Sequence, residues 1–179
     1  MFDAEPTAPP AEIDQLLLDL EQRLAGREPA PPKRPAGDVF ESPMLGRLEF
    51  APMPYGRPSF WRGEQTMPDS DFPLCIVCEV EGDRRPGADH AACVIAFRRL
   101  QVHDANLCAP LINARLSRQQ IPGTIAPDDL VLTLIHLPPH PLTDARFELG
   151  FRAISHPHLV FTVVFVRGKP RSMRVDSDA

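Results

Sequence analysis

Proline is distributed unevenly along this chain of 179 residues, and its placement limits where regular structure can form. Half of the 22 prolines lie between Pro6 and Pro58, and the other half are spread over the remaining two thirds of the sequence. Proline removes a backbone hydrogen-bond donor and stiffens an extended chain. We therefore expect two parts: a proline-rich tail over residues 1–40 and a single folded domain over residues 41–179.

One amphipathic helix is predicted within the tail, over about residues 10–26, followed by a stiff linker over residues 28–35. Apolar residues recur at helical spacing and form one stripe along it: Ile13, Leu16, Leu17, Leu20 and Leu24. A helix of this length is marginal alone in water, so its stripe should pack against something. It packs either on the chain's own domain or, through Leu17 and Leu20, on a partner protein or a second copy of the chain.

The negative charge of the chain is concentrated in the tail. Residues 1–40 hold eight acidic and four basic residues, whereas residues 41–179 hold sixteen acidic and fifteen basic residues. A nucleic-acid-binding protein needs a cationic surface, so we expect no nucleic-acid partner. No apolar stretch approaches the ~20 residues that span a bilayer, and no signal peptide follows Met1. We expect a cytoplasmic protein with no membrane association and with reduced cysteines.

The domain alternates between strand patterns and helical patterns in an order typical of an α+β fold. Two central helices are predicted, the first with Asp89 as N-cap. The second either begins near Ala109, with Pro110 in its first turn, which we favour, or is kinked at Pro110. The predicted strands are short segments within residues 44–63, then 72–81, 130–137, 146–154, 159–166 and 171–175. The last strands are joined by short loops, which favours an antiparallel meander in the C-terminal half. We expect a mostly antiparallel sheet with the two helices on one face, plus the N-terminal helix.

The cysteines include one pair with redox-like spacing, Cys75 and Cys78. Because both lie in a predicted strand, their side chains should point to opposite faces, and they could neither bridge each other nor share a metal. Cys108 lies on one apolar helical stripe, and Cys93 lies on another, which is predicted to be buried, together with Ala96, Phe97 and Leu100. We predict that all four are small buried hydrophobic residues.

The histidines form two pairs, His136 with His140 and His156 with His158. The strand over residues 146–154 should separate the pairs by roughly 25–30 Å, which argues against a joint metal site. There is also no nucleophile elbow and no phosphate-binding loop. We therefore predict no cofactor, no metal and no catalytic residue. An enzyme with a dispersed site is the third alternative for the function.

The only tyrosine and the only tryptophan of the chain lie within residues 55–63. Aromatic residues and arginine anchor many protein interfaces. This makes Tyr55, Arg57, Trp61 and Arg62 candidate partner-binding residues. A tryptophan that closes the core at a sheet edge explains Trp61 equally well.

Several short motifs of the domain follow a recognisable order. Trp61 and Gly63 lead into a strand, residues 127–130 enter another strand, and residues 168–170 form a turn before Asp176. Over about residues 60–176 this pattern resembles small uncharacterised bacterial domains grouped with the immunity proteins of polymorphic toxin systems. The resemblance implies a non-enzymatic protein that binds and neutralises a cognate toxin. The alternative is an interaction or scaffold subunit of a bacterial assembly, docked through the N-terminal helix.

Overall fold

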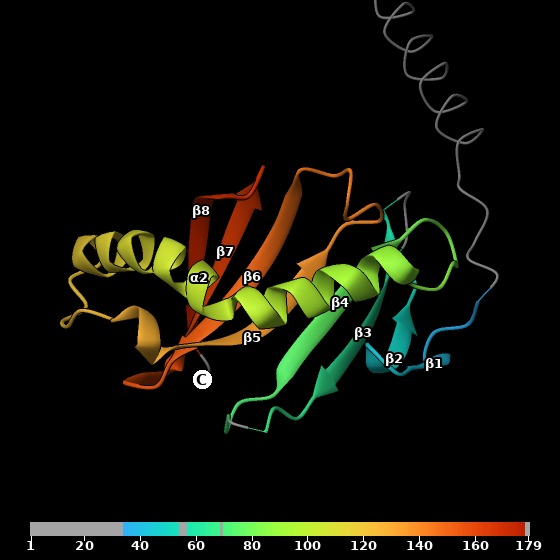
Figure 1. Ribbon diagram of the computed structural model, residues 1–179, viewed down its shortest axis with the longest axis horizontal. Helices are drawn as coiled ribbons and strands as arrows, with labels where there is room; N and C mark the ends of the chain where they lie inside the picture. The colour runs from blue at the N-terminus through green and yellow to red at the C-terminus, as the bar shows by residue number, and fades with distance from the viewer. Residues whose placement is uncertain (1–33, 54–56, 69, 178–179) are drawn as a thin grey trace, which may run out of the picture. The chain divides into compact units, whose positions relative to one another are not determined.

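The computed structural model describes residues 34–53, 57–68 and 70–177, which form one sheet of eight strands and one long helix (Figure 1). The strands are β1 Val39–Ser42, β2 Gly46–Ala51, β3 Ser59–Gln65, β4 Leu74–Val80, β5 Leu130–Leu137, β6 Arg146–Ala153, β7 His156–Val166 and β8 Lys169–Ser177. Helix α2 spans Ala88–Arg118, and a short 3-10 turn, η1, spans Pro127–Asp129. The predicted amphipathic helix over residues 10–26, with Leu17 and Leu20, lies outside the described residues.

The sheet is mixed, which corrects the predicted mostly antiparallel architecture. The strands lie in sequence order, and neighbours are antiparallel except for β4 and β5, which are parallel. Parallel neighbours need a long crossover connection, and α2 supplies it here. Two antiparallel halves of four strands are thus joined through one parallel ladder. Local patterns identify strands but do not specify this pairing, which is why the prediction was wrong.

The two predicted central helices are one continuous helix, α2, which runs through Pro110. Figure 1 shows that the ribbon of α2 changes direction along its length. A proline inside a helix removes one backbone hydrogen bond and bends the helix without necessarily ending it. Buried residues on both sides of Pro110, including Ala105 and Ile112, hold the helix on the sheet. Packing therefore overrides the local breaking signal. The N-cap is Gly87, and Asp89 lies in the first turn.

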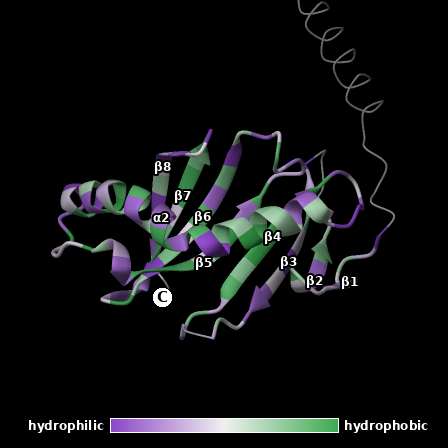
Figure 2. Ribbon diagram, viewed as in Figure 1, coloured by the Kyte–Doolittle hydropathy of each residue, from purple (hydrophilic) through white to green (hydrophobic). Residues whose placement is uncertain are grey.

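Helix α2 covers one face of the sheet, and the core lies between them (Figure 1). The predicted alternation is confirmed in β4, where Leu74, Ile76, Cys78 and Val80 are all buried. Figure 2 shows hydrophobic residues concentrated in β4, which lies at the junction of the two halves, and in β7, which lies inside the second half. Each fully buried leucine or isoleucine contributes about 1.5–3 kcal/mol to folding.

The helical stripe predicted from the sequence is only partly correct. Cys93 and Phe97 pack against the core, and the Phe97 ring lies 4.6 Å from the Phe147 ring of β6, measured between centroids. Leu100, however, is 49% exposed, although we predicted it to be buried. A helix that crosses a twisted sheet contacts it along a shifting line, so a single stripe does not stay in contact over the whole length.

Candidate functional site

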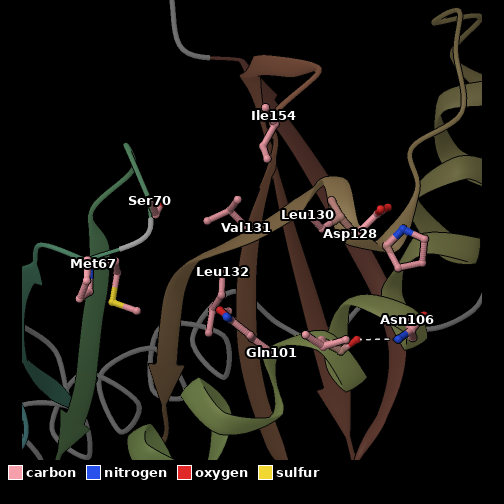
Figure 3. Close-up of a pocket in the computed structure, with 12 residues that line it drawn as sticks. Met67, Ser70, Gln101, Asn106, Asp128, Leu130, Val131, Leu132 and Ile154 are labelled. Atoms are coloured by element: carbon pink, nitrogen blue, oxygen red, sulfur yellow. Dashed lines mark hydrogen bonds between the residues drawn. The ribbon is translucent and has the colours of Figure 1, made fainter.

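A groove of about 580 Å³ lies where α2, the first half of β5 and the connection between β3 and β4 meet (Figure 3). Figure 3 shows side chains from all three elements around it. The residues that line the groove include Val102, Asn106, Asp128, Leu132 and Ile154. A largely apolar concave surface of this size is the default candidate for a binding site.

The groove exists because β5 begins before its neighbour β4. The parallel ladder between the two strands starts at Cys75 and Leu134. Leu130, Val131 and Leu132 therefore have a strand partner on only one side, which is β6, and Thr133 lies at a register shift between β5 and β6 with no paired residue in the described strands. Among the described strands, the first half of β5 is thus an internal sheet edge that faces the groove.

The backbone hydrogen bonds show which groups of β5 face that edge. The amide of Ile154 donates to the carbonyl oxygen of Asp129 at 2.9 Å. In an antiparallel ladder, hydrogen-bonded and non-hydrogen-bonded pairs alternate. Val131 and Arg152 therefore form the next hydrogen-bonded pair, and Leu132 lies opposite Phe151 in a non-hydrogen-bonded pair. The N–H and C=O of Leu132 consequently point away from β6, toward the groove.

Two exposed aliphatic side chains flank the groove. Val102 of α2 is 69% exposed, and Ile154, which follows β6, is 61% exposed. Leu132 is buried and forms part of the wall. Large aliphatic residues exposed around a concave surface are typical of interaction sites, whereas single scattered ones are ordinary.

Two polar side chains of the groove, those of Asn106 and Ser70, are engaged with nearby backbone, whereas Gln101 and Asp128 are exposed. The side-chain amide of Asn106 donates to the carbonyl oxygen of Val102 at 2.8 Å, and the Ser70 hydroxyl donates to the carbonyl oxygen of Phe72 at 3.2 Å. Asp128 is exposed at the rim and makes no hydrogen bond or ion pair within the described part of the chain. These side chains do not form a nucleophile paired with a base.

A serine, a histidine and an aspartate do meet beside the groove, but in an arrangement unsuited to nucleophilic catalysis. The Ser155 hydroxyl donates to the carboxylate of Asp129, and its oxygen lies 3.0 Å from Nδ1 of His156. In a catalytic triad the acid orients the histidine, and the histidine accepts the proton of the serine. Here the acid contacts the serine instead. The cluster fixes the turn between β6 and β7, where the amide of Ser155 also donates to Asp129.

A second polar region lies at the carboxyl ends of β4 and β5, and it pairs glutamates with histidines. Nε2 of His136 lies 3.0 Å from Oε1 of Glu79, and Nε2 of His140 lies 3.1 Å from Oε1 of Glu81. Nδ1 of His136 lies 3.7 Å from Oε2 of Glu148. The sequence pattern did not indicate these pairs, because Glu79 and Glu81 are distant in sequence from the histidines.

The described residues contain no group of three or more His, Cys, Asp or Glu side chains placed to hold a metal ion. His136 has a carboxylate beside each ring nitrogen, so its nitrogens are engaged with separate partners. His156 and His158 follow β6, and His136 and His140 precede it. The structure thus places the two histidine pairs at opposite ends of that strand.

Two of the four cysteines, Cys78 and Cys108, are buried as predicted, whereas Cys75 and Cys93 are only half-buried. Cys75 is half-buried and Cys78 is fully buried, three positions apart on opposite faces of β4. Burial raises the pKa of the Cys78 and Cys108 thiols to about 12. Thiols of this kind are poor nucleophiles near neutral pH, because the thiolate is the reactive form.

The structure describes three of the predicted partner-binding residues, Arg57, Trp61 and Arg62. Trp61 is fully buried, and its indole N–H donates to the carbonyl oxygen of Arg84 at 2.7 Å. The structure therefore favours the core interpretation of Trp61. Arg62 is exposed and pairs with Glu64 at 3.7 Å, and Arg57 is exposed. Tyr55, Leu17 and Leu20 lie outside the described residues.

The sequence reasoning missed the groove, although two signals pointed toward it. Val102 is a large aliphatic residue on the polar side of the helical pattern, and Ile154 is an aliphatic residue at an outward position of the strand pattern. Each signal alone is common at protein surfaces. Only the fold brings them together.

In the part of the chain that the structure describes, no helix combines the length and the apolar character needed to cross a bilayer. Comparisons with protein-family models, with curated proteins and with solved structures gave no match.

Proposed function

We propose that this protein is a non-enzymatic binding module for another protein, and that the groove beside β5 is its docking surface. The observation that supports the proposal most strongly is the first half of β5, which has no strand partner on its groove side and lies between the exposed side chains of Val102 and Ile154. A protein segment can meet both requirements at once, because it offers backbone groups and aliphatic side chains.

The character of the groove supports a protein partner over a small polar ligand. Small-molecule sites place a few converging polar groups among apolar ones. Here the side chains of Asn106 and Ser70 are turned to nearby backbone carbonyls. Among the described residues, the groove offers a partner mainly aliphatic surface and a strand edge, with the Gln101 amide and the Asp128 carboxylate.

The resemblance to immunity-type domains makes a toxin, neutralised by binding, the expected partner. The alternative partner is a subunit of a larger assembly. Growth of cells that produce the partner, with and without this chain, distinguishes the two. A toxin arrests growth when it is produced alone, and this chain restores growth. An assembly subunit has no such effect.

The experiment that tests the docking surface compares three immobilised full-length chains: the parent, Val102→Asp and Leu142→Asp. Leu142 is 64% exposed and does not line the groove, so its variant is a matched control. Proteins retained from the cells that naturally express the chain are identified by mass spectrometry, and the complex is then rebuilt from purified components. We expect Val102→Asp to weaken association at least about tenfold, as at an interface hot spot, and Leu142→Asp to leave it unchanged.

Both substitutions are at exposed positions and should change the free energy of unfolding by no more than about 0.5 kcal/mol. Thermal unfolding of the purified variants checks that both are folded. A partner that binds all three chains with equal affinity would rule out the groove as the docking surface.

A further inference from the structure

We infer that the occupant of the groove is an extended aliphatic segment of the partner, which adds a β-strand to Leu130–Thr133 and places a lysine or arginine beside Asp128. This inference rests on the proposed function and specifies the chemistry of the partner.

The backbone of the first half of β5 has hydrogen-bonding groups without a strand partner on the groove side. The register gives Leu132 a strand partner on the β6 side only, and its N–H and C=O face the groove. The N–H of Leu130 is already bonded to the carbonyl oxygen of Pro127, which leaves its C=O for the groove. A sheet edge with such groups is a template for an added strand.

The length and the aliphatic surface of the groove suit a short added strand. The four residues Leu130–Thr133 offer an edge of about 13 Å, at about 3.3 Å per residue. Alternate side chains of an added strand point to the same face. One set would therefore meet the aliphatic surface of Val102 and Leu132, so alternating valine-like residues suit the groove.

The carboxylate of Asp128 gives the groove a negative charge at one end. Among the described residues, Asp128 is the only charged side chain that lines the groove, and it has no ion-pair partner there. It lies just before Leu130, at the end of the edge where an added strand would begin or finish. A basic residue at that end of the segment complements it.

The test uses capped synthetic peptides of about six residues, a length that covers the edge, with the full-length chain. Valine alternates with threonine in each peptide, and the ends are either lysine or glutamate. Two further lysine-ended peptides carry N-methyl groups on alternate amides, one on the odd positions and one on the even positions. N-methylation removes the donors from one edge of the strand and leaves the composition identical between the two.

Fluorescence anisotropy gives the affinities. We expect the lysine-ended peptide to bind and one N-methylated peptide to bind about tenfold more weakly than the other, because only one edge pairs with β5. Glutamate ends should weaken binding up to about fivefold, and Asp128→Asn should reduce that difference to less than about twofold. Val102→Asp should abolish binding of every peptide.

Several results would overturn the inference. Equal binding of the two N-methylated peptides, or no binding of any peptide up to about 1 mM, a weak-binding limit, would exclude strand addition. A lysine preference that persists in Asp128→Asn would exclude the role of that carboxylate. Self-association that is lost in Val102→Asp would identify a second copy of the chain as the occupant. If strand addition or the role of Asp128 is excluded, the proposed function still stands when the rebuilt complex depends on Val102. The failure of this inference can therefore be told apart from the failure of the proposed function.

Discussion

The amide of Ile154 donates a hydrogen bond to the carbonyl oxygen of Asp129 at 2.9 Å, and this contact fixes which backbone groups of β5 face the groove. Because hydrogen-bonded and non-hydrogen-bonded pairs alternate in an antiparallel ladder, the backbone N–H and C=O of Val131 point toward β6, and those of Leu132 point toward the groove. The proposed function depends on this direction, because it makes the first half of β5 an edge that can accept another strand.

The same relationship predicts a difference in amide hydrogen exchange between two adjacent residues. The N–H of Val131 is bonded within the sheet, whereas that of Leu132 has no strand partner in the described fold. We expect the Leu132 amide of the isolated protein to exchange about tenfold or more faster than the Val131 amide, measured by NMR. Equal rates would mean that the edge is closed in solution.

Gly63 should be essential for packing between β2 and β3. A Cβ atom at this position would lie 2.1 Å from the carbonyl oxygen of Arg47, which belongs to the neighbouring strand and cannot move aside. We expect Gly63→Ala to lower the free energy of unfolding by about 3 kcal/mol or more. Gly87→Ala is the control, since a Cβ there meets no atom within 4 Å, and it should cost about 1 kcal/mol or less.

Denaturant unfolding measures both glycine variants. If Gly63→Ala were as stable as Gly87→Ala, the close approach of the two strands would be wrong. The expected result would also show that Gly63, which forms a short motif with Trp61, is required for packing of the sheet, independent of any partner.

Asp104 should destabilise the fold at neutral pH. Burial raises the pKa of this carboxyl, and its Oδ2 atom has no hydrogen-bond partner among the described residues. An acid whose pKa is higher in the folded state loses stability as pH rises from its unfolded pKa of about 3.9 through its folded pKa. We expect Asp104→Asn to be about 1–3 kcal/mol more stable than the parent near pH 7, with the difference shrinking toward pH 4.

Urea unfolding across this pH range tests the role of Asp104. The comparison is informative because the two side chains have nearly the same shape, so only the charge changes. A difference between the two proteins that is constant with pH would show that Asp104 does not titrate in this range.

The buried thiols should be protected from alkylation. With pKa values of about 12, Cys78 and Cys108 hold almost no thiolate near pH 8, and both side chains are inaccessible. We expect iodoacetamide to modify these two residues only after unfolding in urea, as read by mass spectrometry. Half-buried Cys75 and Cys93 serve as the internal comparison. Modification of Cys78 in the folded protein at the rate of Cys75 would contradict the placement of β4.

Strands were predictable from the sequence because their signals are local. The predicted range 130–137 matches β5, and 146–154 and 159–166 overlap β6 and β7 closely. The break predicted at Pro110 was wrong because burial of Ala105 and Ile112 on either side keeps one helix in place. That outcome depends on tertiary packing, which no local pattern describes.

The candidate site was not predictable in the same way. The groove depends on where the parallel ladder between β4 and β5 begins, at Cys75 and Leu134, and these residues are far apart in sequence. The glutamate–histidine pairs were missed for the same reason, since Glu79 and His136 are 57 positions apart. Trp61 was a candidate contact residue because it is the only tryptophan of the chain. It is buried in the core, where its ring packs against those of Phe40 and Phe50.

The most direct test of the central claim is hydrogen–deuterium exchange of the full-length chain with and without its rebuilt partner. The account predicts slower exchange on binding at Leu130–Thr133 and around Val102, and no change around Leu142. Protection confined to other strands, with unchanged exchange at Leu130–Thr133, would contradict the claim that the groove beside β5 is the docking surface.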